Sequence, residues 1–402
     1  MTDLYTLDDL AAGGRLYGTR VLVRVDFNVP LSDRGEVLDA TRIEEALPTV
    51  EELVAAGARV ILASHCGRPK GKPDPRWSLR PVAAALVGRL GTPVRFAADV
   101  VGAEARETVR MLEPGGVCLL ENLRFDPGET ANDPGFAGAL AAFAEAYVGE
   151  AFGTAHRAHA SVVGVPERLA RKAAGRLMVR EVAALSRLLG APERPFVALV
   201  GGAKIEGKID TLDNLLPRLD ALLLGGGMAN TFLAARGFDL AESLVERERL
   251  EVARGILERA AELGVEVALP RDLVVTDDLE GRGIVETVTP DRVPAGRMAV
   301  DVGPVTREEF AARIADARTL FWNGPLGVFE KPPFDDGTRE VAQALAACSG
   351  YTVIGGGETV AAARQAGVLD AIGHVSTGGG AALELLAGKT LPGVAVLQRE
   401  SR

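Results

Sequence analysis

Two kinds of anion-binding chemistry occupy different halves of the chain. The first half carries basic segments, namely RVDFNVP, SHCGRP, ENLRF and AHRAHAS, and the second half carries glycine clusters, namely GGAK, GGGM, NGPLG, GGGET and STGGG. Guanidinium groups bind carboxylates and phosphates through paired hydrogen bonds, whereas glycines let backbone amides approach a phosphate or a flat ring. The asymmetry predicts two different anionic ligands and the transfer of a group between two lobes.

The basic residues of the first half follow predicted strands. Asp26 and Asn28 come after the segment VLVRV beside Arg24, and Arg42 opens the next predicted helix. One arginine at a strand end is usually a partner in a surface ion pair. Several at successive strand or loop ends predict a small substrate with phosphate and carboxylate groups, because the guanidinium groups would otherwise repel one another. The further basic members of this set are His65, Arg68, Arg124 and Arg157.

Two histidines flank Arg157 and raise the alternative of a metal site. His156 and His159 lie three residues apart, but no cysteine, aspartate or third histidine is spaced to complete a zinc site. Hydrogen-bonded structural histidines are the favoured interpretation for this pair and for His374. His65 differs because it lies at a strand end near the arginines, and we assign it to anion binding.

The segment GAKIEGK at 202–208 satisfies the GxxxxGK part of a phosphate-binding loop. Ile209 follows in place of the serine or threonine that would bind magnesium, so we exclude a Walker-type site. A glycine turn with lysines at the start of a helix still favours phosphate. Lys204 and Lys208 are four residues apart, which would place them on one face of a helix that begins here.

The segment GGGET at 355–359 combines a glycine turn with a carboxylate and a hydroxyl at a predicted helix start. Thr359 alone would be a helix N-cap, whereas Glu358 beside a bound phosphate predicts a Mg²⁺ ion that bridges the two. The segment WNGPLGVFE predicts a nucleoside pocket in which Glu330 accepts hydrogen bonds from ribose hydroxyls. The GGGM and STGGG segments fit tight packing of helix on strand, and GGGM also fits passage of a base along the backbone.

Short aliphatic segments alternate with longer amphipathic segments, as is typical of βαβ units with buried parallel strands. We therefore predict an α/β fold of two doubly wound lobes with mainly parallel sheets. Ligands of such sheets bind beyond the carboxyl ends of the strands, which is where the motifs lie. The predicted strands are residues 21–25, 60–63, 117–120, 196–200, 221–224, 265–269, 319–322 and 351–354.

A helix without an accompanying strand marks the predicted domain boundary. The segment RLMVREVAALSRLL at 176–189 has only helical features, and two prolines in the following APERP end it. We predict an N-terminal domain over 1–175, an interdomain helix over 176–190 and a C-terminal domain over 191–389. A chain of 402 residues, of which 47% are hydrophobic, suffices for two cores.

Charge and cysteine content exclude several classes of protein. The formal net charge of −10 argues against a general nucleic-acid or anionic-membrane surface. The amino terminus lacks the pattern of a signal peptide, and no later segment is apolar for long enough to span a bilayer. Three cysteines far apart predict neither a disulfide framework nor a cysteine metal site. We expect a cytoplasmic monomer without nucleic-acid or membrane partners.

The segments above, in this order, closely resemble phosphoglycerate kinase over almost the whole chain. EAFGTAHRAHAS, LGGGMANTFL and STGGGAALELL extend the likeness. The resemblance implies reversible in-line transfer of the acyl phosphate of 1,3-bisphosphoglycerate to ADP with Mg²⁺, giving 3-phosphoglycerate and ATP, in glycolysis and gluconeogenesis. It also implies two Rossmann-like lobes that close on their ligands, and a C-terminal tail, residues 390–402, that returns to the N-terminal domain.

The resemblance assigns residues to two binding sides. Arg42 and Lys208 are expected to neutralise the charge of the migrating group from opposite lobes, and Glu358 to bind Mg²⁺ together with the nucleotide phosphates. The residues expected to bind phosphoglycerate are Asp26, Phe27, Asn28, Arg42, His65, Cys66, Gly67, Arg68, Arg124 and Arg157. The residues expected to bind the nucleotide are Lys204, Lys208, Gly225, Gly226, Asn323, Glu330, Gly356, Gly357, Glu358 and Thr359.

Three positions depart from the family pattern. Glu358 and Glu150 stand where the family usually has aspartate, and Cys66 stands where it usually has leucine. Glu358 keeps the charge on a longer side chain, so the geometry or affinity of magnesium shifts while the role is retained. Cys66 is either a small buried filler, which we favour, or an oxidisable thiol with a pKa lowered by its basic neighbours.

Two other classes of function fit the same lobes. Another kinase for a small carboxylate is distinguished by whether 3-phosphoglycerate, and not acetate, drives magnesium-dependent formation of ADP. A non-catalytic nucleotide-binding protein should have lost Arg42 or Lys208, and both are present.

Overall fold

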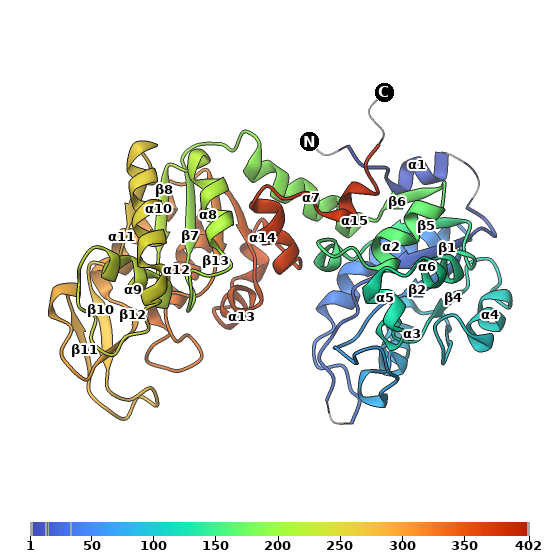
Figure 1. The fold of residues 1–402 in the computed structure, drawn as a ribbon, viewed down its shortest axis with the longest axis horizontal. Coiled ribbons are helices and arrows are strands. Elements are labelled where there is room, and N and C mark those ends of the chain that lie inside the picture. The colour runs from blue at the N-terminus through green and yellow to red at the C-terminus, as the bar shows by residue number, and fades with distance from the viewer. Residues whose placement is uncertain (1–2, 13, 15, 33, 400–402) are drawn as a thin grey trace. The chain divides into compact units, whose positions relative to one another are not determined.

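The computed structural model of the chain describes residues 3–12, 14, 16–32 and 34–399. It divides into two compact units, the first formed by residues 1–183 and 390–402 and the second by residues 184–389. Figure 1 shows that each unit has strands at its centre and helices around them. Within the described ranges, none of the helices combines the length and apolar character needed to cross a membrane.

The first unit is built on a parallel sheet of six strands in the order β3-β4-β2-β1-β5-β6. The central strands β1 and β2 form because their aliphatic residues are almost fully buried on both faces. The strands are β1 (Arg20–Arg24), β2 (Arg59–Ala63), β3 (Val94–Phe96), β4 (Val117–Leu119), β5 (Ala146–Gly149) and β6 (Lys172–Ala174). The helices are α1 (Leu7–Ala12), α2 (Thr41–Ala55), α3 (Arg80–Leu90), α4 (Ala103–Arg110), α5 (Pro127–Ala131), α6 (Pro134–Ala141) and α15 (Pro392–Ala395).

The second unit contains a parallel sheet of six strands in the order β15-β14-β13-β7-β8-β9 and a three-stranded antiparallel sheet in the order β11-β10-β12. The parallel strands are β7 (Phe196–Val200), β8 (Ala221–Leu224), β9 (Glu266–Ala268), β13 (Thr319–Asn323), β14 (Tyr351–Ile354) and β15 (His374–Val375). The antiparallel strands are β10 (Leu273–Thr276), β11 (Val285–Val288) and β12 (Met298–Val302). The helices are α8 (Ile209–Leu215), α9 (Gly226–Ala235), α10 (Leu250–Glu262), α11 (Pro304–Asp316), α12 (Asp336–Ala347), α13 (Gly357–Gln365) and α14 (Gly380–Leu386).

The predicted fold class is confirmed, and all eight predicted strands are present with small shifts at their ends. The prediction missed the short strands β3, β5, β6 and β15 and the antiparallel sheet. Of these, β11 is the hardest to recognise, because three of its four residues are exposed and the strand therefore has no apolar signal. The antiparallel sheet matters because β10 and β12 line the ligand cavity of this unit.

The chain passes between the units inside α7 (Arg176–Leu189) and returns at its C-terminal end. Residues from Thr390 onward belong to the first unit, where Gln398 forms an isolated bridge with Leu4. Leu397 is fully buried in this unit, and its carbonyl accepts a hydrogen bond of 3.0 Å from the backbone of Tyr5. Residues 400–402 of the predicted tail lie outside the described residues.

Candidate active site

A carboxylate at the end of β1 organises the basic residues of the first unit. Asp26 lies 3.3 Å from the guanidinium of Arg42 and 3.7 Å from Nδ1 of His65. Arg42 also donates to the carbonyl of Asn28 at 3.0 Å, while the side-chain oxygen of Asn28 accepts from the backbone of Gly67 at 2.9 Å. These contacts bring five of the predicted substrate residues together, as expected for carboxyl ends of neighbouring parallel strands.

Three of the predicted arginines line one pocket of about 510 Å³ in the first unit, namely Arg68, Arg124 and Arg157. Lys70 and Thr130, which the sequence interpretation missed, line it as well. The described residues that line this pocket include no carboxylate. A small anion with more than one negative group therefore fits the pocket's chemistry.

Arg124 is a buried cation of this pocket that is only partly compensated. It is 8% exposed and donates to the carbonyl of Gly67 at 2.7 Å, but its buried Nε has no hydrogen-bond partner among the described residues. Burial, followed by repulsion from Arg157 and Arg24, lowers the pKa of Arg124 to about 10. A bound anion would relieve the repulsion between these guanidinium groups.

Arg24 stands behind this pocket and is neutralised inside the protein. Its side chain is 1% exposed, donates to the hydroxyl of Ser161 at 2.7 Å and lies 4.0 Å from the fully buried carboxylate of Glu129. Its guanidinium also lies 3.3 Å from Nδ1 of His65. Glu129 accepts from the backbone and hydroxyl of Ser161 at 2.9 and 2.6 Å. Sequence reasoning missed Glu129, which stands in no recognisable motif, and Ser161, which ends the AHRAHAS segment but carries no charge.

Two of the histidines near the arginines are uncharged at neutral pH. Burial, followed by repulsion from Arg24 and Arg124, holds the pKa of His65 well below its usual value. Burial, with repulsion from Arg124, lowers the pKa of His159 to about 4. Nε2 of His156 accepts a hydrogen bond of 3.1 Å from the guanidinium of Arg157 and so helps to position that arginine. Among the described residues, no three His, Cys, Asp or Glu side chains are grouped to hold a metal ion.

Two predicted substrate residues turn their side chains into the core. Phe27 is fully buried and Cys66 is 1% exposed, so only their backbones are available near the pocket. Burial raises the pKa of the Cys66 thiol to about 11. The alternative of a reactive, oxidisable thiol with a lowered pKa is therefore wrong, and Cys66 is a buried filler.

In the second unit, three glycine-containing segments meet at the ends of β7, β8 and β13. The backbone of Gly202 donates to Pro325 at 2.7 Å, and that of Gly226 donates to Leu326 at 2.8 Å. Gly226 has a φ of +66°, and a Cβ placed on it would lie 2.7 Å from the carbonyl oxygen of Gly202. A side chain at this position is excluded by both conformation and space.

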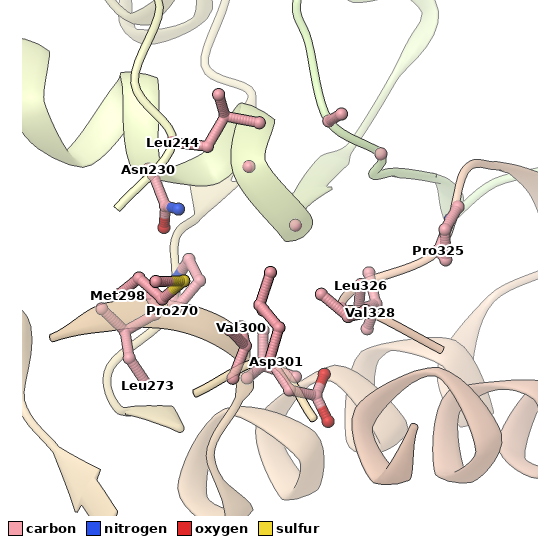
Figure 2. A pocket seen from close by; sticks show the side chains of 18 of the residues that line it. Asn230, Leu244, Pro270, Leu273, Met298, Val300, Asp301, Pro325, Leu326 and Val328 are labelled. Atoms are coloured by element: carbon pink, nitrogen blue, oxygen red, sulfur yellow. The ribbon is translucent and has the colours of Figure 1, made fainter. Parts of the chain in front are cut away.

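A cavity of about 300 Å³ opens beside these glycines (Figure 2). Gly202, Gly226 and Gly227 line it. Apolar side chains from β10, β12 and the segments near them, such as Leu273, Met298 and Val300, form a wall below Asn230 in the view of Figure 2. Glu330 and Glu358 line the cavity and are exposed. The apolar lining residues that sequence reasoning missed are Leu244, Pro270, Leu273, Met298 and Val300.

Lys208 lies directly before α8, which begins at Ile209. The expectation that Lys204 and Lys208 share one helical face is therefore wrong, because Lys204 is exposed in the preceding loop. The ammonium of Lys208 donates to the carbonyl of Gly201 and, at 3.4 Å, to that of Asn323. Burial lowers the pKa of Lys208 to about 8, and the charge of Glu358 acts in the opposite direction.

Asn323 and Thr359 hold the loops around Lys208 together. Asn323 donates from its side chain to the carbonyl of Gly355 at 2.6 Å. The hydroxyl of Thr359 accepts from the backbone of Gly324 at 2.7 Å, so Thr359 is not the N-cap of α13. The cap position belongs to Gly356, whose φ is +95°. The turn GGGET is thereby tied to the end of β13.

Comparison with known proteins decides the family. The family model described as phosphoglycerate kinase matches residues 8–389. The chain belongs to the phosphoglycerate kinase family. It is 57% identical to the phosphoglycerate kinase of Desulforudis audaxviator over 381 residues, which cover 95% of this chain and 96% of the relative. It is 55% identical to that of Thermomicrobium roseum over 382 residues, covering 95% of this chain and 97% of the relative.

Solved phosphoglycerate kinases have the same fold. The structure from Coxiella burnetii matches with a TM-score of 0.88 at 42% identity and covers 96% of this chain and 97% of its own. The structure from Pyrococcus horikoshii OT3 matches with a TM-score of 0.85 at 30% identity, covering 98% of each chain. The protein is thus a kinase of glycolysis that acts on phosphoglycerate and ADP or ATP, and not an unrelated carboxylate kinase.

We expect nucleotide binding to take up a proton at Lys208 above pH 8. Without ligand the lysine is charged below pH 8 and loses its proton as the pH rises past that value. A bound polyanion raises the pKa of the ammonium, so binding of ADP at pH 8.5 restores the charge. Calorimetry at pH 8.5 in buffers of different ionisation enthalpy measures this uptake.

The variants Lys208→Met and Lys204→Met provide the contrast. Lys208→Met should abolish the proton uptake, and Lys204→Met, in the exposed loop, should retain it. Equal uptake in the wild type and in Lys208→Met would show that Lys208 does not receive the proton.

Proposed function

We propose that the first unit binds phosphoglycerate in the arginine pocket and that the second unit binds the nucleotide in the glycine-lined cavity. The observation that carries this assignment is the contrast between the two linings. Three guanidinium groups without a carboxylate among the described lining residues suit a small polyanion, whereas glycine backbone together with apolar side chains suits a flat base with phosphates at one end.

The substrate side has a division of roles. Arg68, Arg124 and Arg157 contact the phosphate and carboxylate of phosphoglycerate, since they line the pocket directly. Asp26 and Asn28 are positioning residues. They hold the side chain of Arg42 and the backbone at Gly67 in place by an ion pair and hydrogen bonds. The buried side chains of Phe27 and Cys66 shape the floor beneath the site.

The nucleotide side supplies one metal ligand. Glu358 is exposed, lines the cavity and interacts electrostatically with the ammonium of Lys208. Mg²⁺ is typically held by one or two carboxylates and the substrate phosphates, so this single side chain fits the ion. The bound ion would neutralise charge on the nucleotide phosphates. Glu330, at the same cavity, is placed to accept from ribose hydroxyls.

Transfer between the two ligands needs alignment and positive charge, and no protein nucleophile. Arg42 is 39% exposed and restrained by Asp26, so its guanidinium is available to a phosphoryl group. Lys208 is mostly buried and donates its hydrogen bonds to backbone carbonyls, which a phosphate oxygen would replace. We assign these two cations to the migrating group. We also propose a monomer, since each pocket is lined by residues of one unit.

Arg42→Ala should lose most turnover and still bind nucleotide. The guanidinium acts on the migrating group and not on the base or ribose, so kcat falls by on the order of 100-fold or more while the Kd of ADP stays within about twofold. Steady-state kinetics with 3-phosphoglycerate and ATP, together with calorimetry of ADP, measure the two effects. Arg76→Ala, which removes an exposed arginine paired with Asp74, is the matched control. An unchanged kcat in Arg42→Ala would remove Arg42 from this role.

Direct transfer also requires the two ligands to meet, so we expect the units to close when both are bound. Closure excludes water, which would otherwise hydrolyse the acyl phosphate. Small-angle X-ray scattering should give a smaller radius of gyration with 3-phosphoglycerate and a non-hydrolysable ATP analogue together than with no ligand. Equal radii in the two states would contradict closure.

A further inference from the structure

Asn230 is a buried polar side chain of the nucleotide cavity whose amide has no hydrogen-bond partner within the described residues. Asn230 lies on α9, is 2% exposed and lines the cavity. Its amide is not hydrogen-bonded to any other residue of the described ranges. The next residue, Thr231, shows the usual outcome on the same helix, since its buried hydroxyl accepts from the backbone of Glu246 at 3.1 Å. An amide that lines a cavity and has no partner in the protein is available to a ligand that supplies one.

The surroundings of the amide narrow the chemistry of that ligand. Figure 2 shows the Asn230 amide extending toward Pro270 and Met298 on the apolar wall, with Leu244 above it. These neighbours offer flat or flexible apolar surface and no competing side-chain donor. A flat ring with a polar edge fits these surroundings, because its faces pack on apolar side chains while its edge meets the amide.

The other polar side chains of the cavity are directed elsewhere. One oxygen of Asp301 accepts from the backbone of Gly337, at the beginning of α12, at 2.7 Å. Its other oxygen, Oδ1, has no hydrogen-bond partner among the described residues, but it faces Gly327 and Gly337 so closely that a Cβ placed on these glycines would be 2.5 and 2.4 Å from it. In Figure 2 the carboxylate turns toward the helices below and away from Asn230. Because Glu330 and Glu358 are exposed and assigned to the ribose and the phosphate end, Asn230 is the lining side chain left for the base.

We propose that Asn230 recognises the 6-substituent of the purine base and is the residue that sets base specificity in this cavity. The inference rests on the proposed function, which places the nucleotide here. A carboxamide has one donor group beside one acceptor, and adenine presents the complementary pair through its 6-amino group and a ring nitrogen. The same amide turned over matches the 6-oxo group and N1–H of guanine. Recognition therefore concerns the 6-substituent and its neighbouring ring atom, and not adenine alone.

The test compares ATP with purine riboside triphosphate, which carries hydrogen in place of the 6-amino group. In the wild type we expect kcat/KM to favour ATP by on the order of 10–100-fold, because the analogue leaves the amide acceptor unpaired. In Asn230→Leu, which keeps the volume and removes the amide, the ratio should fall to within about twofold of unity. The change should appear in KM for ATP with little change in kcat.

Two further variants separate recognition from packing. Asn230→Asp keeps an acceptor and loses the donor, so it should retain part of the discrimination even if the leucine variant folds poorly. Thr231→Val removes a hydroxyl that only supports the protein, and it should keep the wild-type ratio. Discrimination near unity in the wild type, or a wild-type ratio in Asn230→Leu, would overturn the inference.

Lys208→Met distinguishes failure of the inference from failure of the proposed function. This variant should weaken the binding of ATP and of purine riboside triphosphate equally, since the lysine acts at the phosphate end. If Lys208→Met and Asn230→Leu both leave the KM of ATP unchanged, the nucleotide does not bind in this cavity and both proposals fail. If Lys208→Met alone weakens ATP, the cavity assignment stands and the role of Asn230 is wrong.

Discussion

The first unit holds several positive charges close together without fully neutralising them, and the rest of its structure depends on this constraint. Arg24 is balanced internally by Glu129 and Ser161, and Arg42 is restrained by Asp26. Arg124 is compensated less, because burial and the neighbouring arginines lower its pKa by more than Glu129 and Asp26 raise it. Holding several cations together at strand ends requires a rigid sheet, and the buried core beneath β1 and β2 supplies it. We propose that the substrate completes the charge balance.

The second unit solves a different problem, which is to bring a backbone close to a large, flat ligand. Gly202 and Gly226 approach each other and the segment after β13 closely, and no side chain fits between them. The antiparallel sheet then adds an apolar wall to the same cavity. Lys208 and Glu358 bring charge to the glycine side, while Asn230 is left as the polar group near the apolar wall. We propose that the phosphates lie toward the charged groups and the base toward the apolar wall.

Much of this arrangement follows from the sequence, because parallel strands bring the residues after them to one edge. The aliphatic strands were recognisable, and of the residues marked by the motifs after them, Arg124 lines the pocket of the first unit and Glu358 lines the cavity of the second. The roles of these residues stay predictions. The apolar wall was not predictable, since its residues are scattered between 244 and 300 and β11 has no apolar periodicity. Predictions from local sequence patterns were also wrong at positions where tertiary contacts decide what a side chain binds.

Thr359 and Lys204 show this limit on the scale of single residues. A hydroxyl near a helix start resembles a cap, yet Thr359 bonds to the strand end of another segment. A spacing of four suggests one helical face, yet α8 begins only after Lys208. Asn230 gave no signal at all, because an asparagine inside an apolar helix is distinguished only by the absence of a partner among the described residues once the fold is known.

The central claim is that each unit holds one of the two substrates, and amide hydrogen exchange with each ligand alone tests it most directly. We predict that 3-phosphoglycerate slows exchange around residues 65–71 and 124–130 and leaves residues 202–208 and 226–230 unchanged. ADP with Mg²⁺ should do the reverse. Protection of the same unit by both ligands, or protection with the ligands exchanged, would contradict the account.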